Sequence, residues 1–185
     1  MLPIILASGS PRRRELLSMI VSDYTVRTSD VDESAIVGDT PAETAGKLAE
    51  AKCLAVAKEH PDSIVIGCDT VVDWNKAIFG KPKDRADAVR MLTALSGTTH
   101  KVHTGVCICQ GEKKELLVCT SEVEFYPIDP ELMQRYVETD EPYDKAGGYA
   151  IQGTAALFCK EIRGCYYNIM GFPVSRVAQM LKKFE

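Results

Sequence analysis

Along this chain, short apolar runs alternate with segments in which apolar residues recur at helical spacing. Such runs predict strands, and the helical spacing predicts amphipathic helices packed against them. We expect strands at 3–7, 24–28, 63–74, 101–109, 116–126 and 155–162. We expect helices at 11–20, 40–58, 84–97, 129–137 and 173–184. The alternation predicts one mixed α/β domain over residues 1–185, without a repeat or a linker.

Local signals mark where the helices begin. Ser10 precedes Pro11, and the Thr-Pro-Ala-Glu segment at 40–43 has the capping-box pattern with proline at the first helical position. We therefore expect Ser10 and Thr40 to cap the helices that follow them.

Composition narrows the functional class. The 185 residues are 45% hydrophobic and carry a formal net charge of −4, which is typical of globular proteins and unsuited to wrapping nucleic acid. No apolar run approaches the ~18 residues that span a bilayer, and no signal peptide is recognisable. The cysteines number seven and form no C-x-x-C pair, so we expect free thiols and a cytoplasmic location. His100 and His103 are separated by an odd number of positions on a predicted strand, which places them on opposite faces and excludes a shared metal site.

The first candidate site is the turn Ser8-Gly9-Ser10 and the three arginines that follow Pro11. Hydroxyls, arginines and free backbone N–H groups at a helix start favour an anion such as phosphate. The alternative is a capped surface helix with a solvated basic turn.

Lys52 is the second candidate. At about 100° per residue it falls within the apolar stripe of Ala45, Leu48, Ala49 and Val56. Either its ammonium reaches past the stripe to solvent, or the stripe faces a cleft that holds an anion. In the second case we expect Lys52→Met to lower catalysis while thermal stability holds or rises.

Asp69 is the third candidate, because it lies within the apolar run 64–72. A carboxylate in a buried strand is costly unless it is paired or bound to metal. We favour a metal ligand or a general base over a structural aspartate bonded to backbone. Asp30, Asp32 and Glu33 form an acidic cluster that could supply a second carboxylate, although such clusters are more often exposed loops.

Lys81 and Lys145 lie beside glycine or proline, in Gly-Lys-Pro and Asp-Lys-Ala-Gly-Gly segments. Together with the arginines and Lys52 they form a set of cations that a triphosphate could satisfy. Metal-assisted phosphoryl chemistry is therefore indicated. The sequence contains neither G-x-x-x-x-G-K-[ST] nor G-x-G-x-x-G, so a P-loop or a dinucleotide site is not expected.

With these residues in place, the sequence resembles the Maf family of nucleoside triphosphate pyrophosphatases. The resemblance covers nearly the whole chain and rests on several ordered motifs. These motifs are Leu6-Ala7-Ser8-Gly9-Ser10-Pro11-Arg12-Arg13, Gly67-Cys68-Asp69-Thr70, Gly80-Lys81-Pro82, Leu95-Ser96-Gly97, Asp144-Lys145-Ala146-Gly147, Tyr149-Ala150-Ile151-Gln152-Gly153 and Met170-Gly171-Phe172-Pro173. The resemblance implies the fold of inosine triphosphate pyrophosphatases, with an elongated central mixed sheet, two lobes and a cleft between them. It also implies a homodimer.

The resemblance further implies hydrolysis of a nucleoside triphosphate to the monophosphate and pyrophosphate, with Mg²⁺ or Mn²⁺. Asp69 matches the family's active-site acid, and Arg12, Thr70 and Gln152 match positions linked to substrate choice. Other positions match cleft residues, namely Ser8, Ser10, Arg13, Glu33, Lys52, Lys81 and Lys145. Lys52 and Glu33 are catalytic candidates beside Asp69, and Asp69 and Glu33 are the candidate metal ligands, because Mg²⁺ prefers carboxylate oxygens.

The Ser-Pro-Arg-Arg form resembles the branch acting on dTTP and UTP, whereas the 7-methyl-GTP branch tends to carry Trp in place of Arg12. Cys68 and Gly148 stand where the family usually has Ala, and both changes are small. Two alternatives remain open: a nucleotide-binding regulator of cell division with little turnover, and an inosine or xanthosine triphosphate pyrophosphatase.

Overall fold

The computed structural model describes residues 2–184 and contains one seven-stranded mixed sheet. The strands are β1 (Ile4–Ala7), β2 (Thr25–Val26), β3 (Ile64–Trp74), β4 (Ala77–Phe79), β5 (Thr99–Gln110), β6 (Lys113–Phe125) and β7 (Cys159–Arg163). Their order is β2-β1-β3-β5-β6-β7, and β4 pairs with β3. β1 runs parallel to β2 and β3, and the other pairs are antiparallel. The predicted mixed α/β class is confirmed.

The helices are α1 (Pro11–Leu17), α2 (Pro41–Glu59), α3 (Arg85–Leu95), α4 (Pro130–Val137), α5 (Tyr166–Ile169) and α6 (Val174–Leu181). Short 3₁₀ turns are η1 (Glu33–Ala35), η2 (Ala146–Gly148), η3 (Thr154–Leu157) and η4 (Lys182–Phe184). Within residues 2–184, none of the helices combines the length and the apolar character needed to cross a bilayer. The seven cysteines are free thiols.

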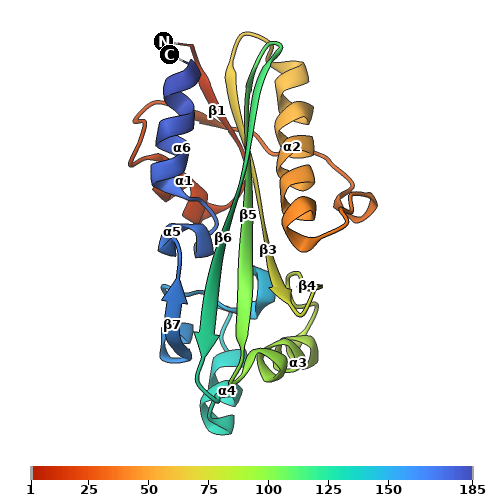
Figure 1. The fold of residues 1–185 in the computed structure, drawn as a ribbon, viewed down its shortest axis with the longest axis vertical. Coiled ribbons are helices and arrows are strands. Elements are labelled where there is room, and N and C mark those ends of the chain that lie inside the picture. The colour runs from red at the N-terminus through yellow and green to blue at the C-terminus, as the bar shows by residue number, and fades with distance from the viewer. Residues whose placement is uncertain (1, 185) are drawn as a thin grey trace.

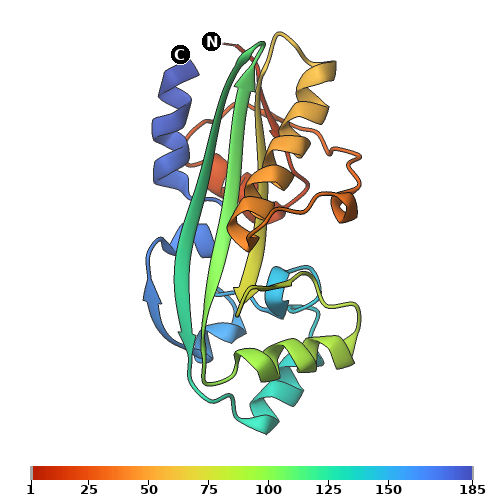
Figure 2. The same ribbon diagram turned by 45° about the vertical axis from the view of Figure 1, so that its right-hand side comes forward.

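The long strands β3, β5 and β6 run through two lobes (Figures 1 and 2). We name one lobe the α2 lobe, which is formed by β1, β2, α1, α2 and α6. The other is the α3 lobe, which is formed by β4, α3, α4, β7, η2 and η3. Each has a core of its own. Leu6, Leu17 and Phe172 belong to the core between the sheet, α1 and α6, whereas Leu92 and Phe125 belong to the core of the α3 lobe.

Helix α2 lies unusually close to the sheet. A Cβ atom at Gly67 of β3 would overlap the carbonyl oxygen of Ala49, and one at Gly105 of β5 would overlap that of Ala45. Since only glycine permits this contact, the two glycines set the height of α2 above the strands. The contact brings the buried stripe of α2, and Lys52 with it, directly over β3.

The helix starts are as predicted, with one difference in chemistry. The Thr40 hydroxyl accepts from the Glu43 N–H at 3.1 Å, and the Glu43 carboxylate accepts from the Asp39 N–H at 2.9 Å. Ser10 occupies the N-cap of α1, but its side chain makes no capping hydrogen bond. Its N–H instead donates to the Ser8 hydroxyl at 3.3 Å, so the prediction of a side-chain cap at Ser10 was wrong.

The predicted strand 155–162 was also wrong in its first half. Residues Thr154–Leu157 form η3, and β7 begins only at Cys159. The Glu141 carboxylate accepts from the N–H groups of Thr154 and Ala155 and holds this segment as a turn. A contact from so far along the chain overrides the local strand propensity.

Other helix and strand boundaries differ from the predicted ones by a few residues. α1 ends at Leu17 rather than near 20, and only Thr25–Val26 of the segment 24–28 pairs with β1. Strand β4 was not predicted. It follows a tight turn in which Asn75 and Lys76 have positive φ angles of 51° and 70°, the geometry of a two-residue hairpin.

Candidate active site

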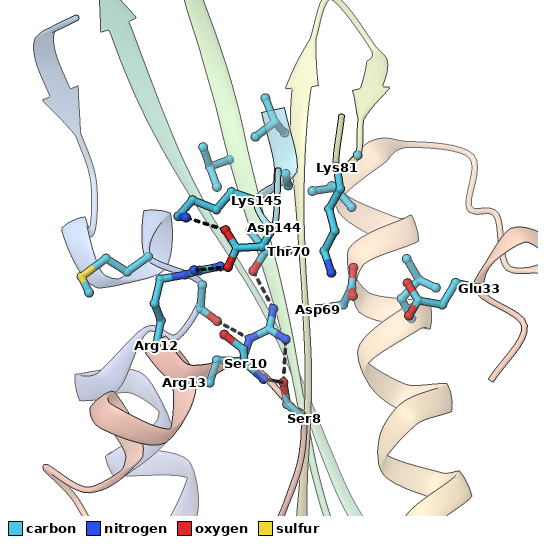
Figure 3. Close-up of a pocket in the computed structure, with 18 of the residues that line it drawn as sticks. Ser8, Ser10, Arg12, Arg13, Glu33, Asp69, Thr70, Lys81, Asp144 and Lys145 are labelled. Carbon is cyan, nitrogen blue, oxygen red and sulfur yellow. Dashed lines mark hydrogen bonds and ion pairs between the residues drawn. The ribbon is translucent and has the colours of Figure 1, made fainter. Parts of the chain in front are cut away.

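A cavity of about 880 Å³ lies between the two lobes. All the predicted site residues line it, namely Ser8, Ser10, Arg12, Arg13, Glu33, Lys52, Asp69, Thr70, Lys81, Lys145 and Gln152. Figure 3 shows most of them turned toward one another from both lobes. The volume falls in the range of pockets that hold small organic ligands.

Arg13 is fixed by the nearby turn at Ser8 and by two segments that are distant in sequence. Its Nε donates to the carbonyl of Gly171 at 2.9 Å, Nη1 to the Ser8 hydroxyl at 3.0 Å, and Nη2 to the Thr70 hydroxyl at 3.1 Å (Figure 3). Three of its five N–H donors are thereby used. The guanidinium is held in one orientation at the cavity wall, with two donors left for an anion.

Lys52 lies between two carboxylates. Its Nζ is 2.6 Å from Oδ1 of Asp69 on β3 and 2.9 Å from Oε1 of Glu33 in η1. The Lys52 side chain is 13% exposed and that of Asp69 12%, so this pair is largely shielded from solvent. Lys52 therefore lines the cavity and does not reach past the apolar stripe to solvent, whereas an anionic ligand for it stays a prediction.

The rest of the acidic cluster does not join Glu33. Asp30 and Asp32 are outside the cavity lining, and the Asp32 carboxylate caps η1 by accepting from the Ser34 N–H at 3.1 Å. Asp32 therefore serves to turn the chain so that Glu33 faces Lys52.

Asp144 joins the lobes and was missed by the sequence analysis. Its carboxylate accepts from Arg12 Nη1 of α1 at 3.2 Å and also pairs with Lys145 (Figure 3). Burial raises the pKa of the Asp144 carboxyl, but the hydrogen bond and charge of Lys145, together with Arg12, outweigh it and hold that pKa below its usual value. Arg12 and Lys145 are thus paired with the same carboxylate. The signal for Asp144 in the sequence was only its place beside Lys145.

The two lysine loops of the α3 lobe are connected. The Gly147 N–H donates to the carbonyl of Gly80 at 3.0 Å, which brings the segments carrying Lys81 and Lys145 side by side. Gly147 has φ +73°, and a Cβ there would lie 2.8 Å from a methyl of Val72. Glycine is therefore required where this turn packs on β3.

An apolar part of the cavity wall was also missed. Ile36 and Val37 follow η1, and Ile78 lies on β4, so apolar side chains line the cavity from both lobes. Val37 and Ile78 are among the exposed large hydrophobic residues. Such a surface suits the flat face of a nucleobase, and Gln152 lines the same cavity.

Cys68 adjoins Asp69 but does not suit nucleophilic chemistry. It is fully buried, and its thiol donates to the carbonyl of Gly171 at 3.2 Å. Burial raises the pKa of the Cys68 thiol to about 11, so the reactive thiolate is scarce near neutral pH.

The carboxylates of Asp69 and Glu33 fit a hard divalent cation. Both present an oxygen to the same ammonium, so both reach one point in the cavity. Within residues 2–184, no group of three or more His, Cys, Asp or Glu side chains is arranged as a metal cage. Two carboxylates match the usual way in which proteins bind Mg²⁺, since the ion keeps several waters and takes further ligands from substrate phosphates.

The fold and the cleft together define a two-lobed α/β protein whose cavity is built for an anionic ligand of nucleotide size. The family model described as "Maf-like protein" matches residues 3–184, and the chain belongs to this family. A dTTP/UTP pyrophosphatase of Bacillus cytotoxicus is 45% identical over 98% of this chain and 95% of its own length. Another, of Pelotomaculum thermopropionicum, is 47% identical over 98% of this chain and 96% of its own.

Solved structures support the fold. The Ham1 protein of Staphylococcus aureus aligns with a TM-score of 0.52 over 99% of this chain and 100% of its own, at 16% identity. A HAM1 protein of Coxiella burnetii gives 0.54 over the same shares, at 17% identity. The predicted inosine-triphosphate-pyrophosphatase-like architecture is confirmed.

Proposed function

We propose that this chain hydrolyses dTTP and UTP to the nucleoside monophosphate and pyrophosphate. The dTTP/UTP pyrophosphatases that match it over nearly their full length support this proposal. The single observation that carries it is the cavity in which Asp69, Lys52 and Glu33 meet the arginines and lysines of both lobes. A triphosphate needs many cations, and a displacement at phosphorus needs a carboxylate beside them.

The reaction breaks the bond between the α-phosphorus and the bridging oxygen to the β-phosphorus. A water molecule attacks the α-phosphorus and loses a proton, and pyrophosphate leaves with the electron pair of the broken bond. Asp69 has two roles open to it, accepting the proton of this water or holding the metal ion. Both roles require a carboxylate that faces the cavity, and Asp69 presents one there, 2.6 Å from the ammonium of Lys52.

Mg²⁺ or Mn²⁺ would be held by Asp69 and Glu33, and when bound it supplies positive charge to the phosphate oxygens. Lys52 stands between these two carboxylates. We infer that its ammonium moves onto a phosphate oxygen when the substrate and the cation enter.

Four further cations would neutralise the leaving pyrophosphate: Arg12, Arg13, Lys81 and Lys145. Two of them, Arg12 and Lys145, are paired with Asp144. Phosphate binding would exchange this one carboxylate for several phosphate oxygens. The hydroxyls of Ser8 and Ser10 would donate to phosphate oxygens beside Arg13.

The base would lie against the apolar wall, read by the Gln152 amide, with Arg12 and Thr70 contributing to substrate choice. A glutamine amide offers one donor group and one acceptor, which suits the imide edge of uracil or thymine. A purine would leave these polar groups unpaired, so we expect ATP and GTP to be poor substrates.

The test is a panel of nucleoside triphosphates with Mg²⁺ and with Mn²⁺, scored for pyrophosphate release. The expected result is that dTTP and UTP have the highest kcat/KM, and that no release occurs without a divalent cation. Tight nucleotide binding without turnover would favour the regulatory alternative. A preference for inosine or xanthosine triphosphate would favour the other enzyme class.

We also propose a cytoplasmic homodimer without nucleic-acid or membrane partners, as the family resemblance and the acidic net charge of −4 suggest. Sedimentation equilibrium of the purified chain tests the dimer directly.

A further inference from the structure

A hydrogen-bond chain runs from the cavity wall into the buried sheet. Arg13 Nη2 lies 3.1 Å from the Thr70 hydroxyl, which lies 2.9 Å from the Thr104 hydroxyl, which lies 2.9 Å from the carbonyl oxygen of Asn168. Thr70 on β3 and Thr104 on β5 are direct partners in the antiparallel ladder. Thr104 is fully buried, whereas Thr70 lines the cavity.

The two ends of this chain determine the direction of every hydrogen bond in it. A guanidinium can only donate and a carbonyl oxygen can only accept. Thr104 must therefore give its single hydroxyl hydrogen to Asn168. Its oxygen is then the acceptor in the bond with Thr70, so Thr70 gives its hydrogen to Thr104 and accepts from Arg13.

This direction determines what Thr70 offers to a ligand. Its only hydrogen is used inside the protein, so toward the cavity it has a lone pair and no donor. A phosphate oxygen that carries no hydrogen cannot form a hydrogen bond with an acceptor at this position. The position instead suits a ligand group that donates a hydrogen bond.

A uridine or thymidine nucleotide has few such donors, the imide N–H of the base and the hydroxyls of the sugar. Cytosine differs from uracil at the same ring nitrogen, where it carries a lone pair instead of N–H. The amide of Gln152 can turn over and serve either base. Thr70 cannot reverse its polarity while Thr104 holds its hydrogen.

We propose that Thr104 is a positioning residue that fixes Thr70 as an acceptor, and that Thr70 so fixed accepts the imide N–H of uracil or thymine and discriminates against cytosine. The identity of the ligand in this inference rests on the proposed function. The donor-to-acceptor direction of the three hydrogen bonds does not depend on it.

The first experiment compares kcat/KM for UTP and CTP in the unsubstituted protein and in Thr104→Val and Thr104→Ser. Valine keeps the shape and removes the hydroxyl, which frees Thr70 to donate into the cavity. We expect the ratio of kcat/KM for UTP to kcat/KM for CTP to fall about 10-fold in Thr104→Val, which corresponds to the loss of roughly one hydrogen bond. In Thr104→Ser the ratio should be within about 2-fold of that of the unsubstituted protein. A merely structural role would lower both activities together and leave the ratio unchanged.

Thr98→Val is the matched control. The Thr98 hydroxyl also donates to a backbone carbonyl, that of Leu95 at 2.9 Å, and Thr98 is outside the cavity lining. Its UTP/CTP ratio should equal that of the unsubstituted protein. An unchanged ratio in Thr104→Val, or a serine variant as relaxed as the valine variant, would overturn the proposal. A change in the ratio of UTP to 3′-deoxy-UTP alone would assign the donor to the sugar and refute the imide contact.

The second experiment needs neither substrate nor turnover. Neutron diffraction from ligand-free crystals in D₂O locates hydroxyl deuterium atoms directly. We expect the deuterium of Thr104 to point at the Asn168 oxygen and that of Thr70 to point at Thr104. A Thr70 deuterium directed into the cavity would refute the fixed polarity even if the enzyme hydrolyses UTP. The expected arrangement would stand even if it hydrolyses no nucleotide.

Discussion

The two lobes build their halves of the cleft from different kinds of backbone. In the α2 lobe, Asp69 lies in the middle of a long strand and Lys52 in the middle of a 19-residue helix packed on that strand. In the α3 lobe, Lys81 follows β4 in a loop, and Lys145 precedes a 3₁₀ turn. Side chains on regular elements are held more precisely than side chains on turns.

This difference indicates a division of labour. The groups that must be placed precisely for the displacement at phosphorus lie on the rigid α2 lobe. The α3 lobe contributes the charge-neutralising lysines Lys81 and Lys145, and both lie on turns, where the backbone can adjust to the ligand. Substitutions of Asp69 and Lys52 in the α2 lobe should therefore lower kcat, and substitutions of Lys81 and Lys145 in the α3 lobe should mainly raise KM.

The largest effect is expected for Asp69→Asn. The amide keeps the shape but cannot accept the proton of water or bind a divalent cation strongly, so kcat should fall on the order of 10²-fold or more. Circular dichroism and thermal melting should show a folded protein, since an amide is easier to bury than a carboxylate. Asp73→Asn on the same strand is the control, because Asp73 bonds His103 and is outside the cavity lining. Near-normal turnover by folded Asp69→Asn would contradict the assignment.

Lys52→Met should lower kcat about 100-fold, the loss of one cation acting in a shielded site. The sequence predicted that the stability of Lys52→Met would hold or rise. This prediction does not fit the ion pair observed between Lys52 and Asp69. Methionine leaves Asp69 without its partner in a mostly buried position, so the free energy of unfolding should fall by about 1–3 kcal/mol. Urea titration measures this change. Lys47→Met, on the same helix but in an exposed pair with Glu43, should change neither quantity by much.

Burial of His100 in the core of the α3 lobe should make the stability of the protein depend on pH. It is 2% exposed between Phe125 and Tyr149, and burial lowers its pKa to about 4. The unfolded chain, with a histidine pKa near 6.5, binds more protons than the folded chain between about pH 4 and pH 6.5. The protein should therefore lose up to about 3 kcal/mol of stability as the pH falls through this window. Urea titrations at pH 7 and pH 4.5 measure this loss of stability. If a His100→Gln variant lost as much stability on acidification, the loss would not arise from His100.

The smallest effect is expected for Lys81→Met. Removing one cation from an adjustable turn should raise KM about 5- to 10-fold and leave kcat within about 2-fold. Lys83, two positions later, is exposed and outside the cavity lining, so Lys83→Met is a closely matched control. If Lys81→Met lowered kcat as strongly as Lys52→Met, the division of labour between the lobes would be wrong.

The sequence predicted the regular elements and most of the cleft because their signals are local. The capping box at Thr40 and the helical period that placed Lys52 in a buried stripe both act within a few turns of one helix. What the sequence could not supply depends on distant partners. η3 is held by Glu141, 13 positions before Thr154, and Asp144 acquires its role only when Arg12 approaches from the other lobe.

The hold on Arg13 has a consequence for how the protein is made. The carbonyl that fixes its guanidinium belongs to Gly171, 158 positions later, whereas the β5–β6 hairpin closes through neighbouring residues. Local pairings form early and long-range pairings late, so the hairpin can assemble while the chain is still being synthesised. The phosphate-binding corner must wait until the segment around Gly171 has left the ribosome. A truncated translation product could therefore keep most of its sheet and still lack a working site.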